Sequence, residues 1–269
     1  MHPVLFEFNT PDFLKSIFPN TITIYTYGFL IAVGVFLAYY YTAYHAKKQF
    51  NLSYDQTQVM IILIIVAAVI GGKFFIIFED PSRYLSHPGD LFKNFGSGFV
   101  FYGSLIFAIP TIYLFIRYHK LPLLPMLDII AGTTCIVHGM GRLGCFFAGC
   151  CYGIPTDSFV GMNFKAGNGI DADVHPTQLY SSILIWSIFI YLMRVKKSQE
   201  FQGQLFLTYL ILYSIGRSVI EIFRGDESRG YVIENVISNS QFISLIVFSI
   251  AIYFYIKLKN NSTYKMEGS

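Results

Sequence analysis

Four polar side chains recur at helical spacing inside an apolar segment of the C-terminal third of the chain. They are Tyr213, Arg217, Glu221 and Arg224, separated by four, four and three residues. This spacing places them on one face of a helix, among Leu, Ile and Phe residues. An arginine at the centre of a bilayer costs about 2.5–3.5 kcal/mol, and a carboxylate one turn away offsets part of that cost. A structural ion pair is one explanation, but it leaves one arginine unneutralised.

A second segment, HGMGRLGCFFAGCCYG at 138–153, carries Arg142 at the end of another apolar run. A guanidinium group matches phosphate oxygens with two parallel hydrogen bonds. Three arginines at similar depth therefore predict an anion site, and the anion that a membrane offers is a phospholipid head group. Gly141 and Gly144, in the same segment, would allow close approach of a backbone.

The cysteines of this segment admit three explanations. Cys145, Cys150 and Cys151 lack the paired C-x-x-C spacing that zinc sites usually show. A disulfide from Cys145 to Cys150 or Cys151 is an open alternative. The simplest explanation is that these are small residues in close packing, as we expect for Cys135 within the preceding helix. We therefore expect no metal and no cofactor.

Further candidates are expected near the same depth. Tyr27 lies at the start of the first apolar segment, and Tyr102 lies at the start of the third. The run HPTQLYSS at 175–182 opens another apolar segment and contributes His175 and Gln178. Taken alone, such a histidine is more often an interface residue than a catalyst.

The elements that carry these residues are membrane helices. Hydrophobic residues make up 54% of the 269 residues and charged residues only 13%, whereas soluble domains carry about 25% charged residues. Mean hydropathy is +0.52. The net charge of +3 gives no indication of nucleic-acid binding. The N-terminus lacks a basic region followed by an apolar one, so we expect no cleavable signal peptide.

The predicted fold class is all-α: a polytopic membrane protein with seven transmembrane helices. Apolar runs long enough to cross a bilayer core of about 30 Å recur along the chain. We expect spans at about 22–46, 56–78, 99–117, 121–140, 177–194, 203–224 and 239–258. The fourth contains Asp128 and His138, which indicates a helix facing protein or water rather than lipid.

Basic residues near the helix ends predict the orientation, because cytoplasmic loops are enriched in Lys and Arg. With seven spans, one side receives Lys47, Lys48, Arg117, Lys120, Arg194, Lys196, Lys197, Lys257, Lys259 and Lys265. We expect that side to be the cytoplasm, with the N-terminus outside and the C-terminus inside. The segment at about 141–176 would form a small external cap on a single membrane domain, 1–269.

At these residues the sequence resembles the prolipoprotein diacylglyceryl transferase family, enzymes of the bacterial cytoplasmic membrane. The resemblance covers nearly the whole chain. It is carried by IGGKFFIIFED, PGDLFKNFGSGFVFYGSL, GMGRLGCFFAGCCYG, HPTQLY, the R-x-x-x-E-x-x-R stripe and NSQFISL, in this order. The family has seven spans, with the N-terminus outside, and joins the diacylglyceryl group of phosphatidylglycerol to the lipobox cysteine of prolipoprotein signal peptides, releasing glycerol phosphate.

The resemblance also implies roles for residues. The family's two essential arginines correspond to Arg142 and Arg217, and with Tyr102 and His175 these are the candidate catalytic residues. The candidate substrate-binding residues are Tyr27, Tyr213, Glu221, Arg224, Gly141, Gly144 and Gln178. Expected partners are phosphatidylglycerol, the prolipoprotein and membrane lipids, without nucleic acid. Expected localisation is the inner membrane, with the active site toward the outside.

Two departures from the family pattern bear on the mechanism. Tyr102 stands where many members have histidine, and Cys145 and Cys150 replace the usual asparagine and acid of the signature. The base for the acceptor thiol therefore stays open among Tyr102, His175, His138 and the leaving phosphate. The departures also leave open another acceptor or a loss of activity.

Two other function classes remain. A transporter of an anionic lipid would use the same arginines, but transporters often show repeated halves, and no repeat is evident. A thiol redox protein would use the cysteines and would leave Arg217 and Glu221 unexplained.

Overall fold

The computed structural model describes residues 3–11, 21–87, 89, 100–164, 172–224, 231–233 and 236–262. The chain divides into two compact units, Met1–Tyr41 with Leu127–Ser269, and Thr42–Met126. The division falls within two long helices, α1 (Thr26–Phe50) and α6 (Leu123–Ala148). The prediction of a single membrane domain therefore stays a prediction.

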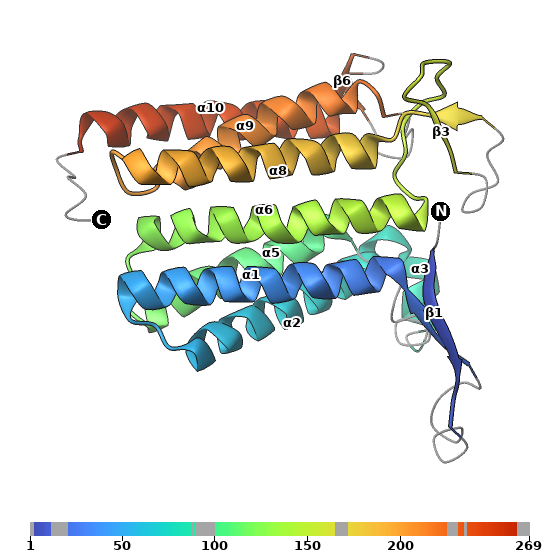
Figure 1. The fold of residues 1–269 in the computed structure, drawn as a ribbon, viewed down its shortest axis with the longest axis horizontal. Coiled ribbons are helices and arrows are strands. Elements are labelled where there is room, and N and C mark those ends of the chain that lie inside the picture. The colour runs from blue at the N-terminus through green and yellow to red at the C-terminus, as the bar shows by residue number, and fades with distance from the viewer. Residues whose placement is uncertain are drawn as a thin grey trace. The chain divides into compact units, whose positions relative to one another are not determined.

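The first unit is built from long helices. After α1 and α6 come α8 (Thr177–Val195), the short 3-10 helix η2 (Lys196–Ser198), α9 (Gln204–Glu221) and α10 (Asn239–Asn260). Figure 1 shows α8, α9 and α10 running side by side. Their shared core includes Cys135 of α6, Ile185 and Leu192 of α8, and Leu205 and Tyr209 of α9. These apolar contacts hold together the helices that carry the candidate site.

A buried acid joins α6 to the start of α9. Asp128 accepts hydrogen bonds from the backbone N–H groups of Gly203 and Phe206, at 2.7 and 2.9 Å. Its carboxylate also accepts a hydrogen bond from Gln199 Nε2 at 2.7 Å. The expectation that this acid faces protein is confirmed, because only 6% of Asp128 is exposed. The N–H groups that begin a helix have no partner within it, and Asp128 supplies one.

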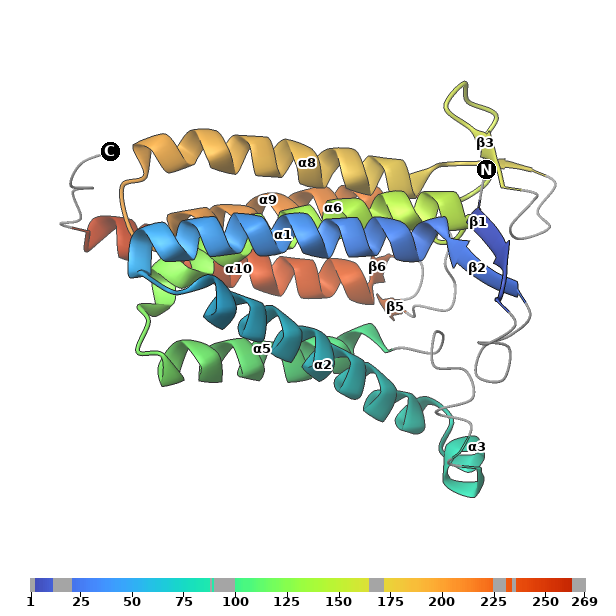
Figure 2. The same cartoon turned by 60° about the horizontal axis from the view of Figure 1, so that its bottom comes forward.

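The second unit is a pair of closely packed helices, α2 (Tyr54–Glu79) and α5 (Phe101–Tyr118), with the short α3 (Pro81–Ser86) between them in sequence. Figure 2 shows α2 and α5 side by side. A Cβ atom added to Gly71 would lie 2.3 Å from the carbonyl oxygen of Gly103, so only glycine permits this approach. Ser104 Oγ donates a hydrogen bond to the carbonyl of Ala68 at 2.8 Å.

In the part of the chain that the structure describes, three small antiparallel sheets accompany the helices. They pair β1 (Val4–Asn9) with β2 (Thr21–Tyr25), β3 (Met162–Asn163) with β4 (Asp173–Val174), and β5 (Tyr231–Ile233) with β6 (Ile237–Ser238). The prediction that the first span begins near 22 was wrong, because Thr21–Tyr25 is a strand and α1 starts at Thr26. The run TITIY contains four consecutive β-branched residues, which favour an extended backbone.

The fourth predicted helix was too short. It was expected to end near 140, but α6 continues to Ala148. Residues 141–148 were assigned to the external cap, whereas they continue the helix, which ends at Gly149 in the left-handed conformation, with φ 69°. The predicted external cap therefore loses its first residues to α6. Strands β3 and β4 lie in its remainder, and residues 165–171 lie outside the described part of the chain.

Within the described residues, five helices are long and apolar enough to cross a membrane: Thr26–Phe50, Tyr54–Glu79, Leu123–Ala148, Thr177–Ser198 and Asn239–Asn260. Helix α5 is apolar but shorter, and α9 carries Arg217 and Glu221. The prediction of a predominantly helical, polytopic membrane protein is confirmed. Long helices also occupy the positions of the other two predicted spans.

Candidate functional site

Arg142 is fixed by a histidine of its own helix. Its Nε donates a hydrogen bond to Nε2 of His138 at 3.3 Å, one turn earlier on α6. A nitrogen that accepts this bond carries no proton, so the imidazole is neutral with its proton on Nδ1. The charge of Arg217 also acts on the His138 ring. His138 thus has a guanidinium group of α6 beside it and one of α9 within electrostatic reach.

Arg217 and Glu221 form the ion pair that their spacing predicts, with Nη2 2.5 Å from Oε2. The N-terminus of α10 contributes two further hydrogen bonds. Arg217 Nη2 donates a hydrogen bond to Ser240 Oγ at 3.0 Å, and Ser238 Oγ donates one to Glu221 Oε1 at 3.2 Å. The side chains of Arg217 and Glu221 are only 11% and 8% exposed. The pair is therefore held in a buried, polar setting.

The two serines were missed in the sequence reading. Ser238 caps α10: its Oγ accepts a hydrogen bond from the Gln241 backbone N–H at 3.1 Å, and Gln241 Oε1 accepts one from the Ser238 N–H. This capping box has a recognisable S-x-x-Q pattern, SNSQ at 238–241. The pattern would have located the helix start, although it could not have shown that the start faces α9.

Tyr213 connects the two arginine-bearing helices. Its ring meets the His138 ring edge to face, with centroids 5.4 Å apart. On its other side it stacks on Tyr209 of α9 at 5.7 Å. Aromatic contacts of this kind fix ring positions and add about 0.5–1.5 kcal/mol beyond burial. The stripe on α9 thus meets Arg142 of α6 through Tyr213 and His138.

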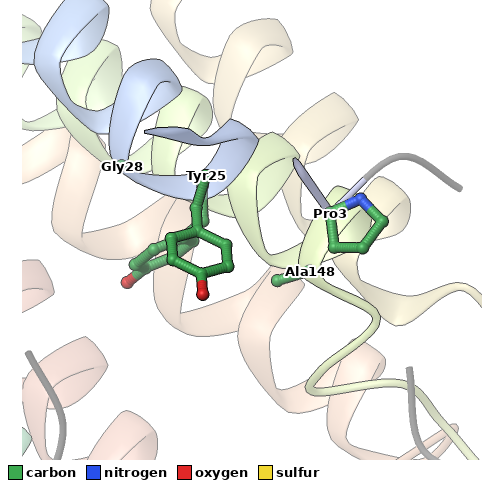
Figure 3. A pocket seen from close by; sticks show the side chains of 5 residues that line it. Pro3, Tyr25, Gly28 and Ala148 are labelled. Atoms are coloured by element: carbon green, nitrogen blue, oxygen red, sulfur yellow. The ribbon is translucent and has the colours of Figure 1, made fainter. Parts of the chain in front are cut away.

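A pocket of about 400 Å³ lies near the C-terminal end of α6. It is lined by Pro3, Tyr25, Tyr27, Gly28 and Ala148. In Figure 3 the methyl group of Ala148 points toward the ring of Tyr25. This mainly apolar lining suits a hydrocarbon chain better than a charged group.

Gly144 and Gly141 differ in their surroundings. A Cβ atom at Gly144 would lie 3.0 Å from Cδ2 of Tyr27, so this glycine permits the close approach of α1 that the sequence suggested. A Cβ atom at Gly141 would meet nothing within 4 Å among the described residues. Gly141 therefore borders open space one residue before Arg142.

The three thiols that follow Arg142 gather in one place. The Sγ atoms of Cys145, Cys150 and Cys151 lie within 4.8 Å of one another. Hydrogen bonds from the Cys145 and Cys150 thiols lower the pKa of Cys151, and the charges of Arg224 and Arg142 lower it further. All three are free thiols in this structure, as is Cys135.

The remaining candidates occupy different surroundings. Arg224 is buried, with 8% exposed, just after α9. Gln178 Nε2 donates a hydrogen bond to the carbonyl of Cys150 at 2.7 Å, which places it at the cysteines rather than at Arg217. His175 Nδ1 lies 3.0 Å from the Tyr180 hydroxyl, and its ring packs on Phe223 at 5.1 Å.

Tyr102 belongs to the second unit, at the start of α5, with 51% of its surface exposed. The arginines belong to the first unit, so the role of Tyr102 stays a prediction.

Known proteins match this chain along almost its whole length. A family model described as prolipoprotein diacylglyceryl transferase matches residues 15–257. The chain belongs to this family. The resemblance expected from the ordered motifs is confirmed.

Individual members of the prolipoprotein diacylglyceryl transferase family agree with this assignment. The phosphatidylglycerol–prolipoprotein diacylglyceryl transferase of Clostridium tetani is 35% identical over 95% of this chain and 97% of its own length. Enzyme 2 of that name from Clostridium perfringens is 34% identical over 88% of this chain and 92% of its own length. The Geobacter sulfurreducens enzyme is 30% identical over 82% of this chain and 86% of its own length. The similarity thus extends across both compact units.

Proposed function

We propose that this chain is a phosphatidylglycerol–prolipoprotein diacylglyceryl transferase, which carries out the first step of bacterial lipoprotein maturation. Membership of the family supports the reaction class. The observation that carries the proposal is the hydrogen bond from Arg142 to the neutral ring of His138, with the charge of Arg217 acting on the same ring. Because the described hydrogen bond of Arg142 goes to an imidazole and not to a carboxylate, its positive charge is available to an anionic head group.

The reaction forms a bond between the acceptor sulfur and a glycerol carbon of phosphatidylglycerol. It breaks the bond from that carbon to a phosphate oxygen, and glycerol phosphate leaves with the electron pair. Negative charge grows on the phosphate as the bond breaks, and fixed guanidinium groups stabilise it without reorganising. Arg142, held by His138, and Arg217, held by Glu221 and Ser240, are positioned to do so.

The acceptor thiol must lose its proton, because the thiolate is the nucleophile. Tyr102, His175, His138 and the leaving phosphate can each take that proton. His138 is the one among them whose described contacts include Arg142, and its Nε2 lone pair accepts the hydrogen bond from that guanidinium group. We therefore assign His138 first to orienting Arg142. To act as the base it would have to break this bond, so it stays one of the four candidates.

The residues around this centre have supporting roles. Tyr213 would fix His138, and Arg224 would add positive charge. Tyr27 and the pocket that it lines would receive an acyl chain or the apolar part of the signal peptide. Gly141 would leave space for the head group.

We further propose seven transmembrane helices in one membrane domain of the bacterial inner membrane, with the N-terminus outside and the C-terminus in the cytoplasm. Basic residues at the C-terminal ends of α1, α5, α8 and α10 support this orientation. Arg142 and Arg217 lie near the C-terminal ends of α6 and α9. In the proposed orientation these ends face the outer side of the membrane.

The test combines purified protein with phosphatidylglycerol labelled in its diacylglyceryl part and a peptide that carries a lipobox cysteine. Transfer of the label to the peptide and release of glycerol phosphate are expected, and a peptide with serine at that cysteine should stay unlabelled. Movement of intact lipid between the leaflets of vesicles, without peptide labelling, would instead favour the transporter. Labelling of a different acceptor would redefine the substrate and keep the chemistry.

A further inference from the structure

Three thiols meet at the end of α6, where the reaction as described above requires none of them. Their Sγ atoms lie within 4.8 Å of one another. Cys145 belongs to the last turn of α6, and Cys150 and Cys151 follow the turn at Gly149. All three are partly exposed, so an ion can reach them from solvent. The end of the helix brings together residues whose sequence spacing gave little sign of a site.

We propose that Cys145, Cys150 and Cys151 together bind one thiophilic metal ion, with Zn²⁺ as the reference case. A Zn–S bond is about 2.3 Å, so two sulfurs on one tetrahedral zinc lie about 3.8 Å apart. Separations of up to 4.8 Å need to contract by only about 1 Å, which small side-chain rotations supply. This proposal replaces the expectation of a site without metal.

The backbone that carries two of these ligands is held from α8. Thr177 Oγ1 donates a hydrogen bond to the carbonyl of Cys151 at 2.8 Å, and Gln178 Nε2 donates one to that of Cys150 at 2.7 Å. Oε1 of Gln178 is buried and has no hydrogen-bond partner among the described residues. Contacts of this kind orient metal ligands and strengthen binding.

Backbone conformation adds to the case. Cys151 has a φ of 62°, in the left-handed region that residues other than glycine seldom occupy. A glycine would adopt it with less strain, so the cysteine side chain is present at an energetic cost. Binding of the Cys151 sulfur to a metal ion would offset this conformational cost.

Charge and stoichiometry favour one metal over a disulfide. Three thiolates and Zn²⁺ carry one net negative charge, and the cationic Arg142 lies on α6 one turn before Cys145. A disulfide would join two sulfurs and leave the third thiol unused, whereas all three lie mutually close. Three protein ligands also leave one zinc position open, as in catalytic rather than structural zinc sites.

The experiment measures metal binding directly, so its outcome is independent of the transferase assay. Full-length protein is purified in detergent, reduced, and titrated with Zn²⁺, and bound metal is counted by mass spectrometry. Co²⁺ serves as a spectroscopic probe, because its sulfur-to-metal charge-transfer bands grow with the number of thiolates. We expect one ion per chain and a spectrum of three thiolates.

Matched variants then test the ligands. Cys145→Ala, Cys150→Ala and Cys151→Ala should each weaken Zn²⁺ binding by more than about 100-fold, above the range for loss of an outer contact. Cys135→Ala is the control, because this cysteine of α6 is buried in the core between the helices and is not one of the three clustered thiols. The wild-type result stands even if a variant fails to fold. Reduced wild-type protein that binds neither ion would overturn the proposal, as would a disulfide between two of the three in freshly purified protein.

Discussion

The Nε atom of Arg142 donates a hydrogen bond to Nε2 of His138, one turn earlier on the same helix. The helix itself fixes this relationship, because residues four apart lie on one face. The bond orients the guanidinium group and keeps the neighbouring imidazole neutral. A cation and a neutral imidazole side by side suit a reaction that must bind an anion and remove a proton.

The first prediction concerns His138. His138→Ala removes the acceptor that orients Arg142, and we expect kcat/KM for transfer to fall by about 10- to 100-fold, the scale of one lost hydrogen bond to a charged group. The pH dependence of kcat separates the two roles: loss of a base changes the profile, whereas loss of orientation lowers the rate at every pH. His119→Ala, at the end of α5, is the control. A His138→Ala enzyme with unaltered kinetics would remove His138 from the mechanism.

The second prediction concerns the two arginines. Arg142→Ala and Arg217→Ala should each lower transfer by at least about 100-fold, the scale for one lost charge-stabilising donor. Lysine replacements should also fail largely, because an ammonium group cannot offer the paired donors of a guanidinium. Transfer assays on protein shown to be folded measure both. Near-full activity of Arg217→Lys would mean that a point charge suffices.

The third prediction concerns Ser240, a positioning residue that holds Arg217 from α10. Ser240→Ala removes the 3.0 Å hydrogen bond, and we expect kcat/KM to fall by about 10-fold. Ser240→Thr keeps the hydroxyl and should restore most of the loss, which a purely packing role would not explain. Ser249→Ala is the matched control, because that hydroxyl bonds only within α10 in its described contacts. Equal effects of Ser240→Ala and Ser249→Ala would contradict the assignment.

The fourth prediction concerns Tyr102. A phenol hydroxyl is a weak acid that holds its proton near neutrality, so it is poorly matched to taking a proton from a thiol. We expect Tyr102 to orient the head group or thiol, so Tyr102→Phe should lower the rate by about 10- to 100-fold. Tyr102→His restores the common family residue and should retain activity. Complete loss in Tyr102→Phe, with His175→Ala unaffected, would identify the tyrosine as the base.

The fifth prediction concerns topology. A reporter fused after Ser269 should read cytoplasmic, and one inserted within 165–171 should read external, because the basic helix ends are expected on the cytoplasmic side. Paired enzymatic reporters active on opposite sides of the membrane measure this. The reverse pattern would place the arginines toward the cytoplasm and defeat the proposed orientation.

Sequence reasoning predicted the long helices and the ion pair, since both follow from local periodicity. Arg217 and Glu221 pair at the spacing of one turn, which needs no knowledge of the fold. The strand at Thr21–Tyr25 was missed, because it pairs with Val4–Asn9, which lies more than ten residues earlier in the sequence. Local periodicity does not reveal such a pairing. The extension of α6 was missed, since residues 141–148 were assigned to the external cap, whereas the chain stays helical up to Gly149.

The composition of the site was harder to predict than its individual residues. Ser240 reaches Arg217 only because the start of α10 lies against α9. The gathering of three cysteines depends on how the chain turns at Gly149, whose left-handed conformation does not follow from the residue type alone. The neutral state of His138 likewise depends on the direction of the Arg142 side chain.

Asp128 controls how far α6 can slide along α9. Its carboxylate is tied to the backbone of Gly203 and Phe206 at the start of α9. Arg142 lies about 21 Å further along α6, at 1.5 Å per residue. Because a rigid helix transmits an axial displacement over its whole length, a slip of one turn at Asp128 would carry Arg142 about 5.4 Å past Arg217. The axial position of Arg142 relative to Arg217 is therefore fixed in part by an acid at the opposite end of α6, and substitutions of Asp128 should alter head-group affinity without contact with the lipid.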